Sequence, residues 1–397
     1  MQRFLCAVLV ISCFVLAPAA AVRAGTVNVN PQDRAVLPSN PLAAIEAARE
    51  RVAASDLDGA IRELATYVLW HPGEIGPERL LGDLYYRHGE LSRAEEQYKH
   101  ILTYAPQDKE THNRLGSVYA TENKVDTAID EFDRSLPGTD SIPDLVRLHI
   151  RKGDFNQYKY EREKAAIDYP TDPAVQLELG QLYLAVHQTD LALRYFRRAL
   201  DEDPASLQAL NDTGRAYLDL HDYDSAIDSF GKCLGRDPSN YACADNLGAA
   251  FLESKRYAEA TNILTIAHRL QPERGEALVN IGFLSDVNGD WKRAVTYYVQ
   301  AMTVYPYAPE AYINLGLDYN QHGFYELAQS ALVKGLAIAP EDGRLHFVLG
   351  DVYARQGNQG MAATQFKLAA DSYDPTVVSL AKERVAALER TGLRVTP

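Results

Sequence analysis

The stretch YINLGLDYNQHGFYELAQ, residues 312–329, decides the fold because its spacing returns along most of the chain. Gly316 is followed by Gly323 seven residues later and by Ala328 twelve residues later. A single occurrence would suit a fragment of a ligand site. A pattern that recurs at a fixed interval instead indicates a repeat architecture, and function then belongs to a surface that the repeats create.

The interval between equivalent glycines is 34 residues, and it is broken once, where Gly116 and Gly180 stand 64 residues apart. An Ala stands twelve residues after each of these glycines, and a Pro stands 24 residues after most of them. The series comprises Gly82, Gly116, Gly180, Gly214, Gly248, Gly282, Gly316 and Gly350; Ala94, Ala128, Ala192, Ala226, Ala260, Ala294, Ala328 and Ala362; and Pro106, Pro204, Pro238, Pro272, Pro306 and Pro340.

Two weaker segments extend the series to ten repeats. Ala48, Ala60 and Pro72 stay in phase before it, and a turn at Gly153 restores the register across the long gap, with one repeat four residues short. The predicted repeats are 41–74, 75–108, 109–138, 139–172, 173–206, 207–240, 241–274, 275–308, 309–342 and 343–376.

Each repeat predicts two helices joined by a turn, because apolar residues recur at helical spacing in both halves. Glycines such as Gly89, Gly153, Gly289, Gly323 and Gly357 mark the turn, where they can adopt positive φ. The small Gly and Ala let the helices approach closely, and the Pro ends the second helix. Aromatic residues are expected to fill the gap beside these small residues: Tyr85, Tyr119, Tyr183, Tyr217, Tyr319 and Tyr353.

These positions resemble the tetratricopeptide repeat family, whose Leu-Gly-x-x-Tyr, Ala, aromatic, Ala and Pro positions appear over most of the chain. The repeat at 139–172 departs from the pattern with Val146, His149 and Tyr158. The resemblance implies an all-α fold of antiparallel helix pairs stacked into a right-handed superhelix, in which neighbouring repeats stabilise one another. Residues 377–397 are expected to form a capping helix and a tail.

The first residues differ from the repeats. Arg3, an apolar run and small residues before Ala24 predict a signal peptide over 1–24, with Ala21 as a second cleavage point. Two other hypotheses stay open: a lipid anchor on Cys13, because VISC loosely matches a lipobox, and an uncleaved N-terminal anchor. Residues 25–40 are expected to be a flexible lead-in.

The net charge of −14 argues against nucleic acid as a partner, because phosphate recognition needs clustered Lys and Arg. It argues equally against a basic membrane-surface protein. After cleavage of the leader we expect no membrane span. The leader and the family resemblance together suggest an exported protein, most simply in a bacterial periplasm; a lipid-anchored or secreted protein is the alternative.

Catalytic motifs are absent from the sequence. It contains no HExxH, CxxC or GxSxG, no Walker loop and no dinucleotide fingerprint. The histidines at the turns, His88, His187, His221 and His322, are interpreted as helix caps and not as metal ligands. We therefore expect no enzyme, no cofactor and no metal site.

The resemblance places binding on the concave face, which the first helix of each repeat lines. Asn246, Asn280 and Asn314 occupy the sixth position of successive repeats, where packing does not require a polar residue. Each amide can pair with a peptide unit of an extended ligand. The row is similar to the asparagine ladder of the O-linked N-acetylglucosamine transferases; the alternative is that these amides are solvated or bond locally.

Charges along the same face are distributed unevenly. Basic residues belong to the middle repeats and acidic residues to the later ones, so a basic segment of the ligand would favour the later repeats. The groove residues predicted in this way are Arg147, Arg151 and Arg215, then Asp245, Glu253, Glu276, Asp286 and Glu310. The Lys and Asn pairs of the family's carboxylate clamp are absent, which disfavours capture of chaperone C-termini.

Cys233 and Cys243 are the only cysteines after the leader, and they stand ten residues apart. In an exported protein such a pair is a disulfide candidate, and here it would pin two adjacent helices. Two small buried thiols are the alternative.

Three functions are compatible with this architecture. The first is a non-enzymatic scaffold of the cell envelope that binds one or more proteins through an extended, basic segment. The second is a carbohydrate-binding or polymer-guiding accessory protein of an export system, which the Tyr-rich composition permits. The third is a non-catalytic subunit of an enzyme formed with another chain. The sequence does not define an oligomeric state.

Overall fold

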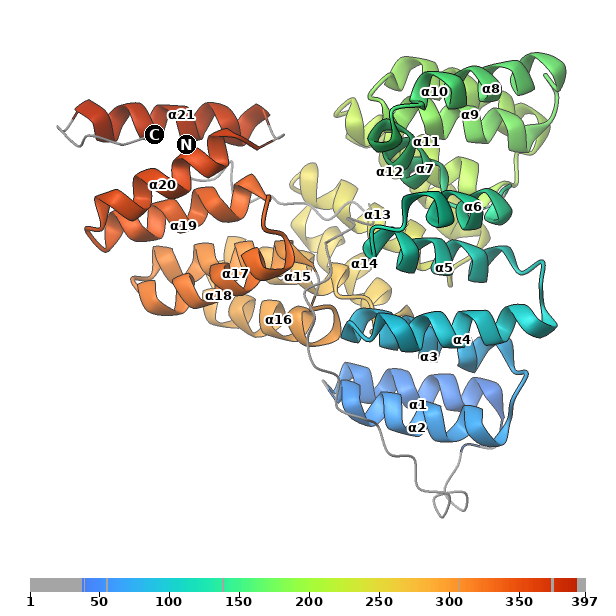
Figure 1. Cartoon of the computed structure of the whole chain (residues 1–397), viewed down its shortest axis with the longest axis horizontal. Helices are drawn as coiled ribbons and strands as arrows, with labels where there is room; N and C mark the ends of the chain where they lie inside the picture. The colour runs from blue at the N-terminus through green and yellow to red at the C-terminus, as the bar shows by residue number, and fades with distance from the viewer. Residues whose placement is uncertain are drawn as a thin grey trace. The chain divides into compact units, whose positions relative to one another are not determined.

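A computed structural model describes residues 38, 40–54, 56–137, 139–306, 308–372 and 375–390. The regular structure of these residues is entirely helical, as the repeat pattern predicts, and comprises 21 helices (Figure 1). None of these helices has the length and apolarity needed to cross a membrane. The expected signal peptide, its Cys13 alternative and nearly all of the lead-in lie outside the described residues.

The helices fall into two compact units. The N-terminal unit, up to Glu273, contains α1 to α14, and the C-terminal unit, from Arg274, contains α15 to α21. The N-terminal helices are α1 (Pro41–Ala53), α2 (Leu57–Trp70), α3 (Ile75–His88), α4 (Leu91–Tyr104), α5 (Lys109–Thr121), α6 (Val125–Ser135), α7 (Ile142–Lys152), α8 (Phe155–Asp168), α9 (Pro173–Ala185), α10 (Thr189–Glu202), α11 (Leu207–Asp219), α12 (Tyr223–Arg236), α13 (Tyr241–Glu253) and α14 (Tyr257–Leu270). The C-terminal helices are α15 (Glu276–Val287), α16 (Trp291–Val304), α17 (Pro309–Gln321), α18 (Tyr325–Ile338), α19 (Gly343–Arg355), α20 (Gln359–Ala370) and α21 (Pro375–Arg390).

The glycines of the 34-residue series sit where the two helices of a pair touch. A Cβ added to Gly116 would lie 2.7 Å from the ring of Phe132, and one added to Gly282 would lie 2.6 Å from the ring of Tyr298. Rings and leucines of the second helix therefore fill this gap. Our assignment of that role to Tyr85 and its equivalents on the first helix was wrong; Tyr85 is buried but does not face the glycine.

The turns inside the repeats adopt the left-handed conformation. The five turn glycines have φ between 81° and 87°. In four other repeats the same place is taken by Asn123, His187, His221 and Lys255, with φ between 58° and 63°. His187 and His221 thus form the turn with their own backbone. Only His322 of the four turn histidines bonds a helix carbonyl, with its Nδ1 2.8 Å from the oxygen of Asp318.

Several first helices begin at a polar cap that the repeat pattern did not single out. The side chains of Asp108, Ser206 and Asn240 each accept a hydrogen bond from a backbone N–H of the following turn. Such caps satisfy donors that a helix start otherwise leaves unpaired.

Helices of the two kinds form separate layers within each unit. The first helix of a repeat contacts the first helix of the next repeat, as α15 contacts α17 and α17 contacts α19, whereas second helices meet their own kind weakly or not at all. We call the first helices the inner helices. At the C-terminal end α21 covers α19 and α20, with Val377 and Ala381 buried against them. This is the packing expected of a capping helix.

Candidate partner-binding face

The inner helices carry all of the predicted groove residues. In the N-terminal unit these are Arg147 and Arg151 on α7, Arg215 on α11, and Asp245, Asn246 and Glu253 on α13. In the C-terminal unit they are Glu276, Asn280 and Asp286 on α15, and Glu310 and Asn314 on α17. The two sets belong to separate units.

Asn246 makes a hydrogen bond inside the N-terminal unit. Its Nδ2 donates a hydrogen bond of 2.9 Å to Oδ1 of Asn211, which joins α13 to α11. Its own Oδ1 is buried without a partner. Because one of its two N–H groups is occupied by Asn211, Asn246 has less of its amide available to a ligand than an unpaired Asn would have.

Asn280 and Asn314 differ from Asn246 in this respect. The side chain of Asn314 is buried, and neither Nδ2 nor Oδ1 has a hydrogen-bond partner. Asn280 is also buried, with an unpartnered Nδ2. A buried amide without partners costs about 1–3 kcal/mol for each unsatisfied group, so most buried polar groups are paired. The C-terminal unit therefore holds unused hydrogen-bonding capacity on two successive inner helices.

The acidic residues of the C-terminal unit fall into two kinds. Glu310 is neutralised by Arg344 of α19, whose Nη2 lies 3.2 Å from Oε1 of the glutamate. Glu276 and Asp286 form no ion pair with a described residue, and Oε2 of Glu276 is buried without a partner. The charge available to a basic ligand is thus smaller than the sequence suggests, and it lies on α15.

Asp286 lies near a second carboxyl group that the sequence pattern did not select. Its charge acts on the carboxyl group of Asp318 on α17. Burial, and then the charge of Asp286, raise the pKa of Asp318 to about 8. Asp318 stands four residues after Asn314 on the same helix, a spacing that signals a shared face and could have identified it.

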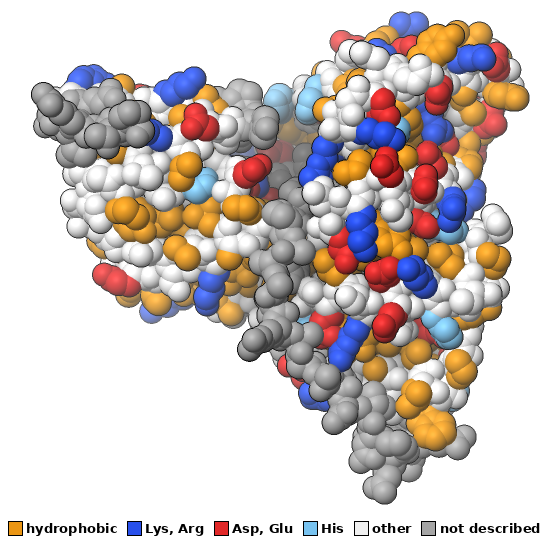
Figure 2. Space-filling model, in the orientation of Figure 1, with side chains coloured by type: hydrophobic (Ala, Val, Ile, Leu, Met, Phe, Trp, Pro, Cys, Tyr) orange, Lys and Arg blue, Asp and Glu red, His pale blue; other side chains and the backbone are white. Residues whose placement is uncertain are grey.

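The basic residues of the N-terminal unit are largely engaged with neighbours. Arg215 donates from Nη1 to Oδ1 of Asp212 over 3.2 Å, and Arg147 pairs with Asp144. Arg151 is exposed at the end of α7. On the face drawn in Figure 2, basic and acidic side chains are interspersed over the N-terminal unit.

Asp212 forms part of a buried polar cluster that the sequence did not indicate. Its Oδ2 accepts a hydrogen bond of 2.6 Å from Nε2 of Gln181 on α9, and the same Nε2 lies 3.4 Å from Oδ1 of Asp140. Burial, then the charge of Asp140, raise the pKa of Asp212 to about 7. The cluster ties three consecutive repeats together.

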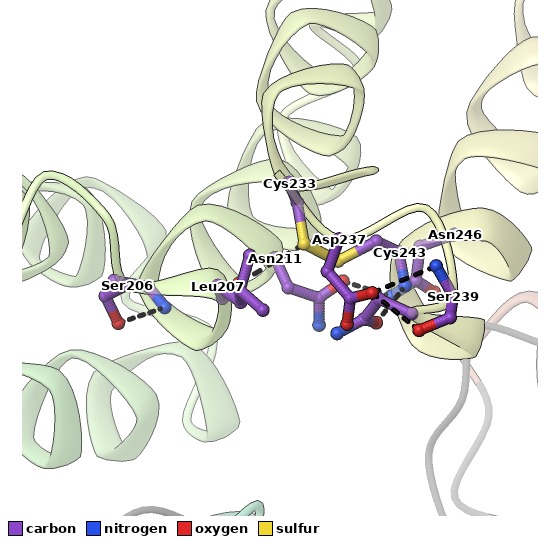
Figure 3. Close-up of a disulfide and its surroundings, with 10 residues drawn as sticks. Ser206, Leu207, Asn211, Cys233, Asp237, Ser239, Cys243 and Asn246 are labelled. Carbon is purple, nitrogen blue, oxygen red and sulfur yellow. Dashed lines mark hydrogen bonds between the residues drawn. A yellow bond between two sulfur atoms is a disulfide. The ribbon is translucent and has the colours of Figure 1, made fainter. Parts of the chain in front are cut away.

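A disulfide joins Cys233 at the end of α12 to Cys243 in the first turn of α13 (Figure 3). Their Cα atoms lie 6.1 Å apart, and both residues are buried in a small apolar cluster with Leu210. The bond fixes the joint between two repeats beside the pair formed by Asn211 and Asn246 (Figure 3).

Stacked helix pairs whose inner layer carries polar side chains define a class of protein: α-solenoid scaffolds without a catalytic constellation among the described residues. The model of the family described as "Tetratricopeptide repeat" matches residues 79–143, 177–241, 211–264 and 313–375, which is more than half of the chain. The chain belongs to the tetratricopeptide repeat family.

A solved structure shares this fold. A tetratricopeptide repeat protein from Parabacteroides merdae is 16% identical, with a TM-score of 0.52, and the match covers 63% of this chain and all of the other. The Cut9–Hcn1 assembly of the APC/C (17%, TM-score 0.49) matches over 87% of this chain and 90% of the other. Yeast Tom70 (14%, TM-score 0.49) matches over 89% and 96%. None of the curated proteins matches the chain.

Membership of this family supports one general function. Tetratricopeptide repeats form protein–protein interaction scaffolds, and their family members are generally non-catalytic. The chain is accordingly an interaction scaffold that binds protein partners.

Proposed function

We propose that the scaffold binds an extended segment of a protein partner along the inner helices of its C-terminal unit. The observation that carries the proposal is the pair of buried, incompletely paired amides, Asn280 on α15 and Asn314 on α17. An extended peptide presents one N–H and one C=O at each residue, and both can pair with such amides. The row then recognises the backbone of the partner and not its sequence.

The energetics require several contacts. A net hydrogen bond contributes about 0.5–1.5 kcal/mol, so two amides alone give only weak binding. Apolar contacts and charge must supply the remainder. Glu276 and Asp286 of α15, which form no ion pair with a described residue, favour a partner segment that carries basic residues, because opposite charge both steers and orients association.

We also propose that the protein acts in the cell envelope, as part of an assembly or export system. The N-terminal sequence supports this setting through its signal-like pattern, and the disulfide between Cys233 and Cys243 supports it because such bonds persist in oxidising compartments. Fractionation of the native host with antibody against the chain tests the setting. Recovery in the cytosolic fraction with an intact leader would exclude it.

Carbohydrate binding is a weaker candidate. The argument from composition depends on exposed rings, and several of the tyrosines are packing residues: Tyr67, Tyr98 and Tyr298 are fully buried. A glycan ligand is therefore retained as an outcome of the binding experiment.

Photo-cross-linking tests the groove. A photoreactive amino acid placed at 280 or 314 should capture a protein in the native host, and the double variant Asn280→Ala/Asn314→Ala should lose the interaction while keeping its helical circular dichroism. Position 232, an exposed residue of α12, is the control for both experiments. The photoreactive amino acid is also placed at 232, and Lys232→Ala is compared with the double variant. Capture from 232 but not from 280 or 314, or unchanged binding by the double variant, would overturn the proposal.

A further inference from the structure

One second helix of the N-terminal unit is much less buried than the others. Of the 14 residues of α8 only Tyr158 is buried, whereas the second helix of each other repeat buries three or more residues. The sequence of this repeat, 139–172, explains the difference. Val146 and Tyr158 stand where the other repeats have Gly or Ala, so larger side chains separate α7 from α8.

The inward side of α8 is fixed by contacts with α7 and α9 (Figure 1). The ring of Tyr158 stacks on that of His149 of α7, with centroids 4.3 Å apart. Nη1 of Arg162 donates a hydrogen bond of 2.8 Å to Oε2 of Glu178 on α9. These contacts determine which side of α8 faces the neighbouring helices, and the residues on the opposite side point away from them.

The outward side of α8 carries large apolar side chains. Tyr160 is 60% exposed, and Ile167 is 77% exposed, which makes it the most exposed large apolar residue among those described. Tyr169, directly after the helix, is 62% exposed. Tyr160 and Ile167 stand seven residues apart, which is about two helical turns, so they share one face. Exposed apolar side chains gathered on one face mark an interaction surface.

Two charges of opposite sign lie at the centre of this outward face. Glu161 and Lys164 are exposed and form no ion pair with a described residue, whereas Lys159 and Glu163, on the flank of the helix, lie 3.7 Å apart. With about 100° of rotation per residue, the exposed side chains at 160, 161, 164 and 167 span about one third of the helix circumference. The face is therefore an apolar stripe that carries one acid and one base.

A second copy of α8, laid antiparallel to the first, complements this face. With the two-fold axis at the middle of the stretch 161–164, each Glu161 stands opposite Lys164 of the other copy. Tyr160 of one copy then lies about 3 Å along the helix axis from Ile167 of the other, at a rise of about 1.5 Å per residue. Asp168, at the C-terminal end of α8, comes beside the N-terminal end of the other helix, where the helix dipole favours negative charge.

We propose that the chain forms a two-fold symmetric dimer through the outward face of α8. The contact is isologous, because the same face serves both copies. The charges favour a second copy over a partner of uniform charge, since such a partner would leave either Glu161 or Lys164 unpaired. Exposed ion pairs contribute little stability, so the apolar contacts provide most of the affinity and the charges set the register. One helix pair is a small interface, and we expect a dissociation constant in the micromolar range.

Sedimentation velocity on the full chain between about 1 and about 200 μM tests the dimer. The parent should change from monomer to dimer over this range. Ile167→Asp should weaken the dimer at least about tenfold, because a charge replaces the apolar side chain in both copies. Leu69→Asp is the matched control: Leu69 occupies the equivalent position of the first repeat, on α2, and is 57% exposed. This variant should dimerise like the parent, and both should keep the parent's helical circular dichroism.

Exchange of the two charges tests the antiparallel pairing. Glu161→Lys and Lys164→Glu should each weaken the dimer, because like charges then face each other across the axis. The double variant Glu161→Lys/Lys164→Glu should recover the affinity of the parent. A mixture of the two single variants should form a heterodimer, because every pair across the axis is then opposite in sign. Non-specific aggregation does not produce this pattern.

Three results would overturn the proposal. The first is a parent chain that stays monomeric up to about 200 μM. The second is a dimer that Ile167→Asp and both single charge variants leave intact, because the contact then lies elsewhere. The third is a dimer that both single variants lose and neither the double variant nor the mixture recovers. If the parent is monomeric and Ile167→Asp loses the partner captured from 280 or 314, the outward face of α8 binds that partner and not a second copy.

Discussion

Nδ2 of Asn246 donates a 2.9 Å hydrogen bond to Oδ1 of Asn211, so one of three amides in the predicted row is occupied within the protein. Asn314, at the equivalent position two repeats later, has no partner on either atom. Residues that are identical in the repeat pattern therefore have different functions, which depend on whether the preceding inner helix supplies a polar partner. Asn211 is that partner, and it stands one position earlier in its own repeat.

This difference predicts opposite effects on local stability. Asn246→Ala should destabilise α13 by about 1–3 kcal/mol, because it removes the bond and leaves the amide of Asn211 unpaired. Asn314→Ala should cost α17 little or nothing, because it removes polar atoms that have no partner. Hydrogen exchange of peptides from α13 and α17 measures both effects. Equal losses of protection in the two variants would contradict the assignment.

Close packing predicts the effect of substituting the repeat glycines. Gly116→Ala should lower the free energy of unfolding by about 1–3 kcal/mol, because the new Cβ would lie 2.7 Å from the ring of Phe132. Gly231 on α12 has no atom within 4 Å of such a Cβ. Gly231→Ala is the matched control and should raise stability by about 0.5–1 kcal/mol, because glycine weakens a helix interior. Urea unfolding followed by circular dichroism measures both; a loss in both variants would refute the packing argument.

The repeat series predicted the helix pairs and their turns because these depend on local spacing and on small residues that recur in phase. It did not predict which side chain fills each glycine gap, since Phe132 and its equivalents belong to the other helix of the pair. Nor did it find Asp212 or Asp318, whose properties arise from burial and from a carboxyl group on a neighbouring element. Spacing within one repeat can place Asp318 on the same helix face as Asn314, but it contains no information on contacts with a neighbouring repeat.

The turn conformation predicts a stabilising substitution. Lys255 has φ of 61°, a region that costs a residue with a Cβ about 1–2 kcal/mol. Lys255→Gly should therefore raise the thermal midpoint, with a net gain below about 1 kcal/mol because glycine also gains entropy in the unfolded chain. Lys232→Gly, in the helical interior of α12, is the control; it should lower the free energy of unfolding by about 1 kcal/mol and therefore lower the thermal midpoint. A decrease in both variants would show that the turn is not strained.

The disulfide predicts that the stability of the protein depends on reductant. Reduction of the bond between Cys233 and Cys243 should lower the free energy of unfolding by about 2–3 kcal/mol, because the bond restricts the unfolded chain. Thermal unfolding with and without dithiothreitol measures the loss. The double variant Cys233→Ala/Cys243→Ala should not respond to reductant, and a peptide map without reductant should contain the linked pair. Identical midpoints for the oxidised and reduced parent would contradict this expectation.

Burial of Asp212 predicts how stability changes with pH. Desolvation, together with the charge of Asp140, raises its pKa from 3.8 to about 7 in the folded protein. Between these values the folded chain holds a proton that the unfolded chain has released. Stability should therefore fall as pH rises through this window, by at most about 1.4 kcal/mol per pH unit from this group.

Asp212→Asn removes the titrating group and keeps an oxygen that can accept the hydrogen bond from Gln181. The urea midpoint of this variant should change less between pH 5 and 7 than that of the parent, because the folded state no longer takes up the proton. Asp228→Asn changes an exposed acid of α12 and should leave the parent's slope intact. If Asp212→Asn keeps the full slope, the proton is held elsewhere, and the cluster of Asp212, Asp140 and Gln181 joins its three repeats by hydrogen bonds that pH does not control.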